Sequence, residues 1–144
     1  GYGFPAAMGA QMAFPERQVI AIVGDGGFQM TLNDLATAVQ YRVPVKIAII
    51  NNRALGMVRQ WQELFYKKRY SYTTITSPDF VKLAEAYGAK GMRITKKEDV
   101  VPALKEALAT DNVVMMDFVV EPEENVFPMV PAGEAINRML NGMA

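Results

Sequence analysis

The sequence predicts an α/β fold, namely a mainly parallel open sheet with helices on both faces. Three observations favour this fold. Short apolar runs that are typical of strands alternate with stretches in which apolar residues recur at helical spacing. Two of these runs, 18–23 and 45–50, are largely apolar along their whole length, as in strands buried on both faces. A helical stretch separates the two runs, and a strand–helix–strand unit within one sheet makes its two strands parallel.

The first predicted helix lies between these two strands. Thr31 and Asp34 resemble a capping box at its start, and apolar residues then recur at helical spacing over 32–39. Pro44 prevents the helix from continuing into the second strand. We therefore expect Gln29 and Asp34 to be structural residues, in a turn and in a cap.

The second half of the chain repeats the alternation. Ser77 is the expected cap of a helix whose first residue is Pro78 and whose left-handed stop is Gly88. A helix over 55–66 is expected from an apolar stripe made of Val58, Trp61, Leu64 and Phe65. The other expected elements are a strand over 91–94, a helix over 99–109, a strand over 113–120, a Pro-interrupted tail over 121–131 and an amphipathic helix over 133–140.

The composition predicts a single globular domain over residues 1–144 and excludes several kinds of chemistry. Hydrophobic residues make up 51% of the chain and charged residues 21%, which is typical of a packed domain. Fifteen basic residues balance fifteen acidic ones, so no basic field is present to bind nucleic acid or an anionic membrane. Cys and His are both absent, which excludes disulfides, thiolate or imidazole metal ligands and a Ser-His-Asp triad. Proton chemistry would have to come from carboxylates, Lys, Tyr or a bound cofactor.

The beginning of the sequence has neither the charged region nor the apolar region of a signal peptide. The longest apolar run is far shorter than the ~20 residues that a membrane-spanning helix needs. We therefore expect no membrane association and a cytoplasmic location. Because the chain does not start with Met, we expect it to be part of a longer protein.

Polar clusters follow both strands at their carboxyl ends, where open parallel sheets bind ligands. Asp25 lies between glycines after the first strand, and Asn52 follows the second strand 27 positions later. One carboxylate, one amide oxygen and a nearby backbone carbonyl suit Mg²⁺, whose shell phosphate and water commonly complete. Backbone N–H groups that could hold the phosphate are those of Gly26, Gly27, Gly56 and Met57. The sequence therefore predicts a Mg²⁺-bridged diphosphate site, while an unrelated phosphate-binding α/β domain stays open as an alternative.

The spacing of these clusters resembles the thiamine diphosphate-binding signature of a decarboxylase and carboligase superfamily: Gly24-Asp25-Gly26, then 24 residues, then Asn51-Asn52. The signature alone would also fit relatives of pyruvate oxidase, oxalyl-CoA decarboxylase or glyoxylate carboligase. Longer stretches are similar to one branch, the acetolactate synthase (acetohydroxyacid synthase) catalytic subunits. These stretches are 1–7, 29–38, 55–63 and 125–131. Met-Val-Arg-Gln-Trp-Gln-Glu within 55–63 narrows the choice to that branch.

The resemblance implies a role for each candidate site residue. Asp25 and Asn52 match side-chain ligands of Mg²⁺, and Ala54 matches a backbone carbonyl ligand. Trp61 matches a residue that lines the substrate channel. The positions that match the surroundings of the cofactor's diphosphate and thiazolium are Gly24, Asp25, Gly26, Gly27, Asn52, Gly56 and Met57. From the residues alone, Met57 and Trp61 also fit the core face of a helix.

The resemblance further implies decarboxylation of pyruvate and transfer of the hydroxyethyl unit to a second 2-ketoacid, in branched-chain amino-acid biosynthesis. The family enzyme also has an aminopyrimidine-binding domain and an FAD-binding domain, and we expect neither in this chain. The resemblance also implies an N-terminally truncated fold, in which the first strand and helix of the diphosphate-binding domain are expected to precede Gly1. The activating Glu of the family enzyme lies in the missing aminopyrimidine domain, so we expect no catalytic residue here and read Glu16, Glu63 and Glu85 as solvated charges. A homodimer or larger assembly and a regulatory subunit are the implied partners. The alternatives are a cofactor-binding module that is inactive alone and another thiamine diphosphate-dependent decarboxylase or carboligase.

Overall fold

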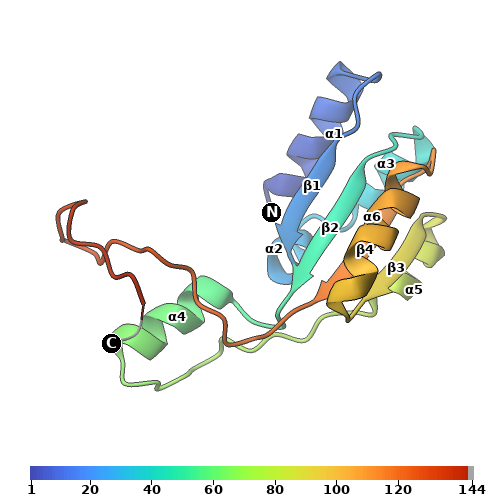
Figure 1. Cartoon of the computed structure of the whole chain (residues 1–144). Coiled ribbons are helices and arrows are strands. Elements are labelled where there is room, and N and C mark those ends of the chain that lie inside the picture. The colour runs from blue at the N-terminus through green and yellow to red at the C-terminus, as the bar shows by residue number, and fades with distance from the viewer. Residues whose placement is uncertain (143–144) are drawn as a thin grey trace.

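A parallel four-stranded sheet forms the centre of the computed structural model, which describes residues 1–142 (Figure 1). The strands are β1 (Ile20–Gly24), β2 (Lys46–Asn51), β3 (Lys90–Ile94) and β4 (Val114–Val119), in the spatial order β1-β2-β4-β3. All three neighbouring pairs are parallel. The predicted parallel α/β fold is therefore confirmed.

Helices cover both faces of the sheet. The described residues form the helices α1 (Gly3–Ala13), α2 (Asp25–Gln29), α3 (Asp34–Gln40), α4 (Gly56–Phe65), α5 (Phe80–Tyr87) and α6 (Val100–Leu108), with a short 3-10 turn before α6. All of these except α4 pack against the sheet. On one face, Ile47 and Ile49 of β2 pack with residues of α1, α2, α3 and α5. On the other face, Ala48 packs with residues of α6. Alternate side chains of one strand thus enter two different cores, as the strand period of two requires.

The edge strand β1 differs from the expectation of a strand buried on both faces. Its burial alternates, and Ile20 and Ile22 are 40% and 74% exposed. No residue of β1 belongs to the core cluster on the α6 side of the sheet. An apolar run therefore marked the strand correctly but did not reveal that one of its faces is uncovered in this chain.

Two expected helix starts are wrong in detail. The capping box at Thr31 and Asp34 does not form, because no side chain caps α3, which Asp34 begins, and the Thr31 hydroxyl instead donates to the carbonyl of Gly1. Asp79 rather than Ser77 caps α5, since its side chain accepts hydrogen bonds from the first-turn backbone N–H groups. The left-handed stop at Gly88 is confirmed, with φ of 85°.

The C-terminal segment differs most from expectation. No helix forms over 133–140; this stretch consists of turns and irregular chain, and Met129 pairs with Leu140 in an isolated antiparallel bridge. From residue 120 the chain leaves the sheet and follows α4, which stands apart from the sheet at the carboxyl ends of the strands (Figure 1). Within residues 1–142, no helix is both long and apolar enough to cross a membrane.

Candidate functional site

A cavity of about 400 Å³ lies at the carboxyl ends of β1 and β2. The register of these strands aligns Gly24 with Ile50, so the residues that follow them in the chain start from the same edge of the sheet. The cavity brings together all the predicted cofactor and metal residues: Gly24, Asp25, Gly26, Gly27, Asn52, Ala54, Gly56 and Met57. The predicted channel residue Trp61 lies outside this lining.

Asp25 is the buried charge of this cavity. It is the first residue of α2 and only 1% exposed. Its Oδ2 accepts a hydrogen bond of 3.0 Å from the Ser77 hydroxyl, and within residues 1–142 no Lys or Arg forms an ion pair with it. A buried carboxylate is costly without a positive partner, so this position is suited to a bound cation.

The glycines of the cavity leave room for a ligand near Asp25 and for the side chain of Asn52. A Cβ added at Gly24 or Gly27 would meet no atom within 4 Å, so a ligand can approach the backbone there. A Cβ added at Gly56 would lie 3.0 Å from Nδ2 of Asn52, so the absence of a side chain at the start of α4 accommodates this amide. These glycines thus make space for both a ligand and its neighbouring polar group.

Asn52 lies in a tight turn. Its Oδ1 accepts a hydrogen bond of 3.1 Å from the backbone N–H of Ala54, and Arg53 between them has a φ of 56°. Backbone bonds from Leu55 to Thr73 and from Ile75 to Arg53 tie this turn to the following loop. The turn therefore holds the Asn52 amide and the Ala54 backbone at the cavity.

The donor set fits a hard cation that binds phosphate. Within the described residues, no group of three or more His, Cys, Asp or Glu side chains could hold a metal ion. A cation in this cavity would therefore have the Asp25 carboxylate and neutral oxygens as protein ligands. Mg²⁺ is commonly bound by one or two carboxylates, with phosphate oxygens and water completing its shell.

The exposed face of α4 is the apolar one. Met57 and Val58 are each 49% exposed and Trp61 is 37% exposed, with its ring 5.4 Å from that of Phe65. The reading of Met57 and Trp61 as helix core residues is therefore wrong for this chain. These side chains line a second cavity of about 700 Å³, whose lining is Met57, Val58, Trp61, Gln62, Tyr66, Arg69 and Ser71. Met57 and Val58 line both cavities, so the two spaces adjoin along α4.

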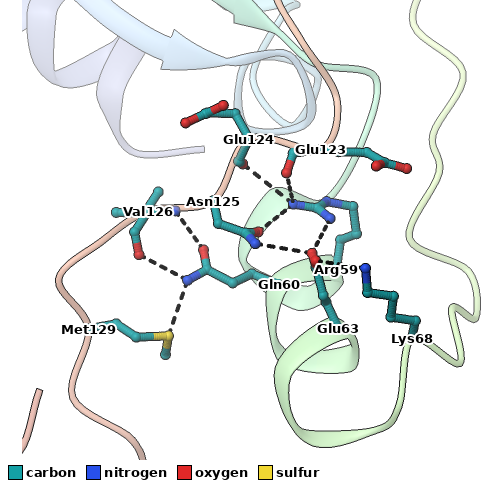
Figure 2. A network of polar contacts seen from close by, with 9 residues as sticks. All are labelled: Arg59, Gln60, Glu63, Lys68, Glu123, Glu124, Asn125, Val126 and Met129. Atoms are coloured by element: carbon teal, nitrogen blue, oxygen red, sulfur yellow. Dashed lines mark hydrogen bonds and ion pairs between the residues drawn. The ribbon is translucent and has the colours of Figure 1, made fainter. Parts of the chain in front are cut away.

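The buried face of α4 is polar. Figure 2 shows Arg59, Gln60 and Glu63 pointing to the C-terminal segment that crosses the helix. Gln60 Nε2 donates to the carbonyl of Val126 at 2.9 Å, and its Oε1 accepts from the Val126 N–H at 2.8 Å. Arg59 donates to the Glu123 carbonyl at 3.0 Å. The side chains of α4 therefore replace hydrogen bonds that this irregular segment cannot make within itself.

Glu63 is not the solvated charge that the sequence predicted. It is buried, and its carboxylate accepts from Asn125 Nδ2 at 3.1 Å and pairs with Arg59 at 2.7 Å. The hydrogen bond from Asn125 holds the pKa of the Glu63 carboxyl below its ordinary value, and the charge of Arg59 acts in the same direction. Glu16 and Glu85 are exposed, as expected.

Sequence reasoning missed the residues whose partners are distant in the chain. Ser77 was read as a cap although it bonds Asp25, 52 positions away. Arg59, Gln60 and Glu63 share one helix face, and the spacing could have identified that face. The pattern could not indicate that residues 123–126 would cover it.

The chain matches the family model described as "Thiamine pyrophosphate enzyme, C-terminal TPP binding domain" over residues 1–118. It belongs to this family. Among curated relatives, this TPP-binding domain is 50% identical to the acetolactate synthase catalytic subunit, mitochondrial, of Saccharomyces cerevisiae over 98% of the chain. It is 49% identical to the acetolactate synthase, mitochondrial, of Schizosaccharomyces pombe over 97% of the chain. The similarity to acetolactate synthases is therefore confirmed.

A bacterial relative and a solved structure extend these comparisons. The acetolactate synthase of Mycobacterium bovis is 52% identical over 92% of the chain. The thiamine diphosphate-dependent 4-hydroxybenzoylformate decarboxylase of Rhodococcus jostii RHA1 has a TM-score of 0.77 and 37% identity over 85% of the chain. The TPP-binding domain spans only about a fifth of the length of each of these proteins: 20% and 21% for the two yeasts, 22% for M. bovis and 23% for R. jostii.

Proposed function

We propose that this chain is the part of an acetolactate synthase that binds the diphosphate end of thiamine diphosphate through Mg²⁺. The observation that carries the proposal is the cavity that gathers Asp25, Asn52 and the glycines that follow β1. The identity of about 50% to acetolactate synthases supports it. The solved decarboxylase is less similar, at 37% identity, so we favour a carboligase over a simple decarboxylase.

Each residue of the cavity has a proposed task. The Asp25 carboxylate, the Asn52 amide oxygen and the Ala54 carbonyl would hold Mg²⁺. The N–H groups assigned to the diphosphate are those of Gly26, Gly27, Gly56 and Met57, with Gly24 keeping the backbone open beside them. When bound, thiamine diphosphate supplies the electron sink for decarboxylation of a 2-ketoacid. The chain itself binds and orients the cofactor, which is the positional part of catalysis.

The substrates follow from the acetolactate synthase assignment. We propose pyruvate as the first substrate and a second 2-ketoacid as the acceptor, in branched-chain amino-acid biosynthesis. The cavity beside Trp61 is a suitable place for the acceptor, since it is largely apolar and adjoins the diphosphate cavity. Trp61 would shape that space.

The remaining parts of the enzyme are assigned outside this chain. We assign the activating Glu and any FAD-binding domain to the portion of the relatives' length that the chain does not span. Glu63 is already engaged by Arg59 and Asn125. A homodimer and a regulatory subunit remain part of the proposal, and the cytoplasmic location stays a prediction because two relatives carry "mitochondrial" in their names.

The replacement of Asp25 by Asn tests the proposal, because it removes the charge and keeps the shape. We expect D25N to weaken binding of thiamine diphosphate in the presence of Mg²⁺ by more than tenfold, measured by titration calorimetry on the 144-residue chain. The matched control is D99N, at an exposed residue that makes no cap hydrogen bond. Unchanged affinity in D25N would contradict the assignment.

A second experiment separates a complete enzyme from a binding module. Acetolactate formation from pyruvate is measured for this chain alone and with the remaining portion of a relative supplied as a separate polypeptide. We expect no activity from the chain alone, because the activating Glu is assigned to the other portion. Activity of the chain alone would contradict that assignment.

A further inference from the structure

A hydrogen-bonded network of three side chains includes Asp25, which lines the cavity. Gln29 Nε2 donates to the Ser77 hydroxyl oxygen at 3.3 Å, and that hydroxyl donates to Oδ2 of Asp25 at 3.0 Å. Asp25 and Gln29 begin and end α2, four residues apart, so they lie on the same face of one helical turn. Ser77 comes from the loop before α5 and bridges the two.

The hydrogen bonds among Gln29, Ser77 and Asp25 allow only one arrangement of donors and acceptors. An ionised carboxylate can only accept hydrogen bonds, so the single hydroxyl proton of Ser77 must point to Asp25. The Gln29 atom facing Ser77 must then be the amide NH₂, which only donates. Gln29 therefore keeps the Ser77 proton directed at Oδ2.

The two carboxylate oxygens of Asp25 have different surroundings. Oδ2 accepts the hydrogen bond from Ser77, while within residues 1–142 Oδ1 accepts none, and Asp25 lines the cavity. A carboxylate held in this way offers one oxygen in a fixed direction. Mg²⁺ demands nearly ideal octahedral geometry, so the direction of each ligand oxygen matters more for it than for larger cations.

Ser77 is free for this task because it does not cap α5. Asp79 accepts the hydrogen bonds from the N–H groups of Val81 and Lys82 at 3.1 and 3.3 Å, so the start of the helix does not need the Ser77 hydroxyl. Ser77 also lines a neighbouring polar cavity of about 440 Å³, in which Asp25 has no part. Within residues 1–142, its one hydrogen bond to a charged group is the bond to Asp25.

We propose that Ser77, oriented by Gln29, is a positioning residue that aims the Asp25 carboxylate at the cation of the cofactor site. The inference rests on the proposed function, because it takes Asp25 as the Mg²⁺ ligand. Groups that orient metal ligands through hydrogen bonds typically change metal affinity by about 10–100-fold when they are removed. Ser77 and Gln29 would act only through Asp25 and touch neither the cofactor nor the substrate.

The test measures the affinity of the 144-residue chain for Mg²⁺ at a fixed concentration of thiamine diphosphate, by calorimetry. We expect S77A to weaken Mg²⁺ binding about tenfold and S77T, which keeps the hydroxyl, to stay within about threefold of the wild type. The control is T76A, at the exposed neighbouring residue. With Mn²⁺ as the probe, electron paramagnetic resonance should show a changed metal spectrum in S77A and an unchanged one in T76A.

A purely structural role for Ser77 would give a different pattern. It would lower the melting temperature of the metal-free chain while leaving the Mg²⁺ affinity and the Mn²⁺ spectrum of the folded variant unchanged, and that result would overturn the proposal. Should S77A fail to fold, Q29L is the variant that tests the proposal. It keeps Ser77 but removes the amide that orients its hydroxyl, and we expect the Mg²⁺ affinity to fall about threefold or more. Wild-type affinity in folded Q29L would also overturn the proposal.

The D25N and S77A variants test the proposed cation site and the positioning role of Ser77 separately. Weak binding in D25N together with normal binding in S77A would keep the proposed function and reject the role of Ser77. Normal binding in D25N would reject the cation site itself, and the positioning role would fall with it.

Discussion

Arg59 and Glu63, one turn apart on α4, form an ion pair in which Nη1 lies 2.7 Å from Oε2 and both side chains are less than a tenth exposed. Ion pairs at this spacing are usually exposed and contribute little to stability. This pair is buried because residues 123–126 cross the helix, and Asn125 bonds to both of its members (Figure 2). The attachment of the C-terminal segment to α4 therefore depends on these two charges.

Replacement of Arg59 by Met should destabilise α4 strongly, because it leaves the Glu63 carboxylate buried without its closest positive partner. Removing one member of a buried pair typically costs about 3–5 kcal/mol. Urea unfolding followed by the fluorescence of Trp61, the single Trp of the chain and a residue of α4, measures the loss. The matched control is R138M, which removes the cation of an exposed pair with Glu134 and should cost less than about 1 kcal/mol. Equal losses in the two variants would contradict this account of the buried pair.

The stability that Glu63 contributes should depend on pH in one direction. Its pKa is lowered in the folded chain, first by the hydrogen bond from Asn125, so the contribution is present above the pKa of about 4.3 that an unfolded Glu has. It is lost as the pH falls from there through the folded value. The difference in unfolding free energy between the wild type and E63Q should therefore be constant near neutral pH and shrink below about pH 4.3. A difference that grows on acidification would show that the pKa of Glu63 is not lowered in the folded chain.

On α4, a polar-to-apolar replacement should be more harmful than an apolar-to-polar one. Gln60 is 1% exposed and satisfies both backbone groups of Val126, so Q60L should leave these groups without partners and cost about 1–3 kcal/mol. Val58, two positions away, is 49% exposed, and V58S should change the stability by less than about 0.5 kcal/mol. Unfolding followed by Trp61 fluorescence gives both values, and amide exchange at Val126 should become faster only in Q60L. The opposite ranking would mean that the apolar face of α4 is the covered one.

Gly91 lets β3 approach α5 closely. A Cβ at this position would lie 2.7 Å from both Cα and the carbonyl oxygen of Val81, and backbone atoms of a packed helix cannot move aside cheaply. We expect G91A to lower the unfolding free energy by about 1–3 kcal/mol, measured by chemical denaturation. The control is G9A in α1, where an added Cβ meets nothing within 4 Å and the helix should gain up to about 1 kcal/mol. A stable G91A would require that β3 and α5 can move apart.

The sheet was predictable because its signals are local and repeated. The apolar runs 18–23, 45–50 and 113–120 each overlap an observed strand, and the carboxyl-end position of Asp25 and Asn52 follows from their parallel pairing. The predicted roles of these two residues remain part of the proposal. α1 and α2 were not predicted, since Gly lowers helix propensity in both and packing on β1 compensates for it.

Other errors arose where a local pattern has more than one possible partner. An apolar stripe on α4 predicts an amphipathic helix equally well whichever face is covered, and here the polar face is the buried one. The sequence predicts Ser77 as the cap of α5, and only the fold decides that Asp79 caps the helix while Ser77 bonds to Asp25. The amphipathic pattern over 133–140 is compatible with a helix, but Leu140 pairs with Met129 instead.

The sequence by itself determined where the strands lie, that they run parallel and at which edge of the sheet the polar clusters meet. These features depend on the spacing of apolar residues, the chain direction and the residue types. Only the tertiary structure decided which face of α4 is covered, that Glu63 is buried and that Ser77 bonds to Asp25. The physical reason is that each of these features depends on hydrogen bonds between residues 52 to 69 positions apart in the sequence. A buried polar group takes whichever partner the fold brings to it, and a local pattern does not specify that partner.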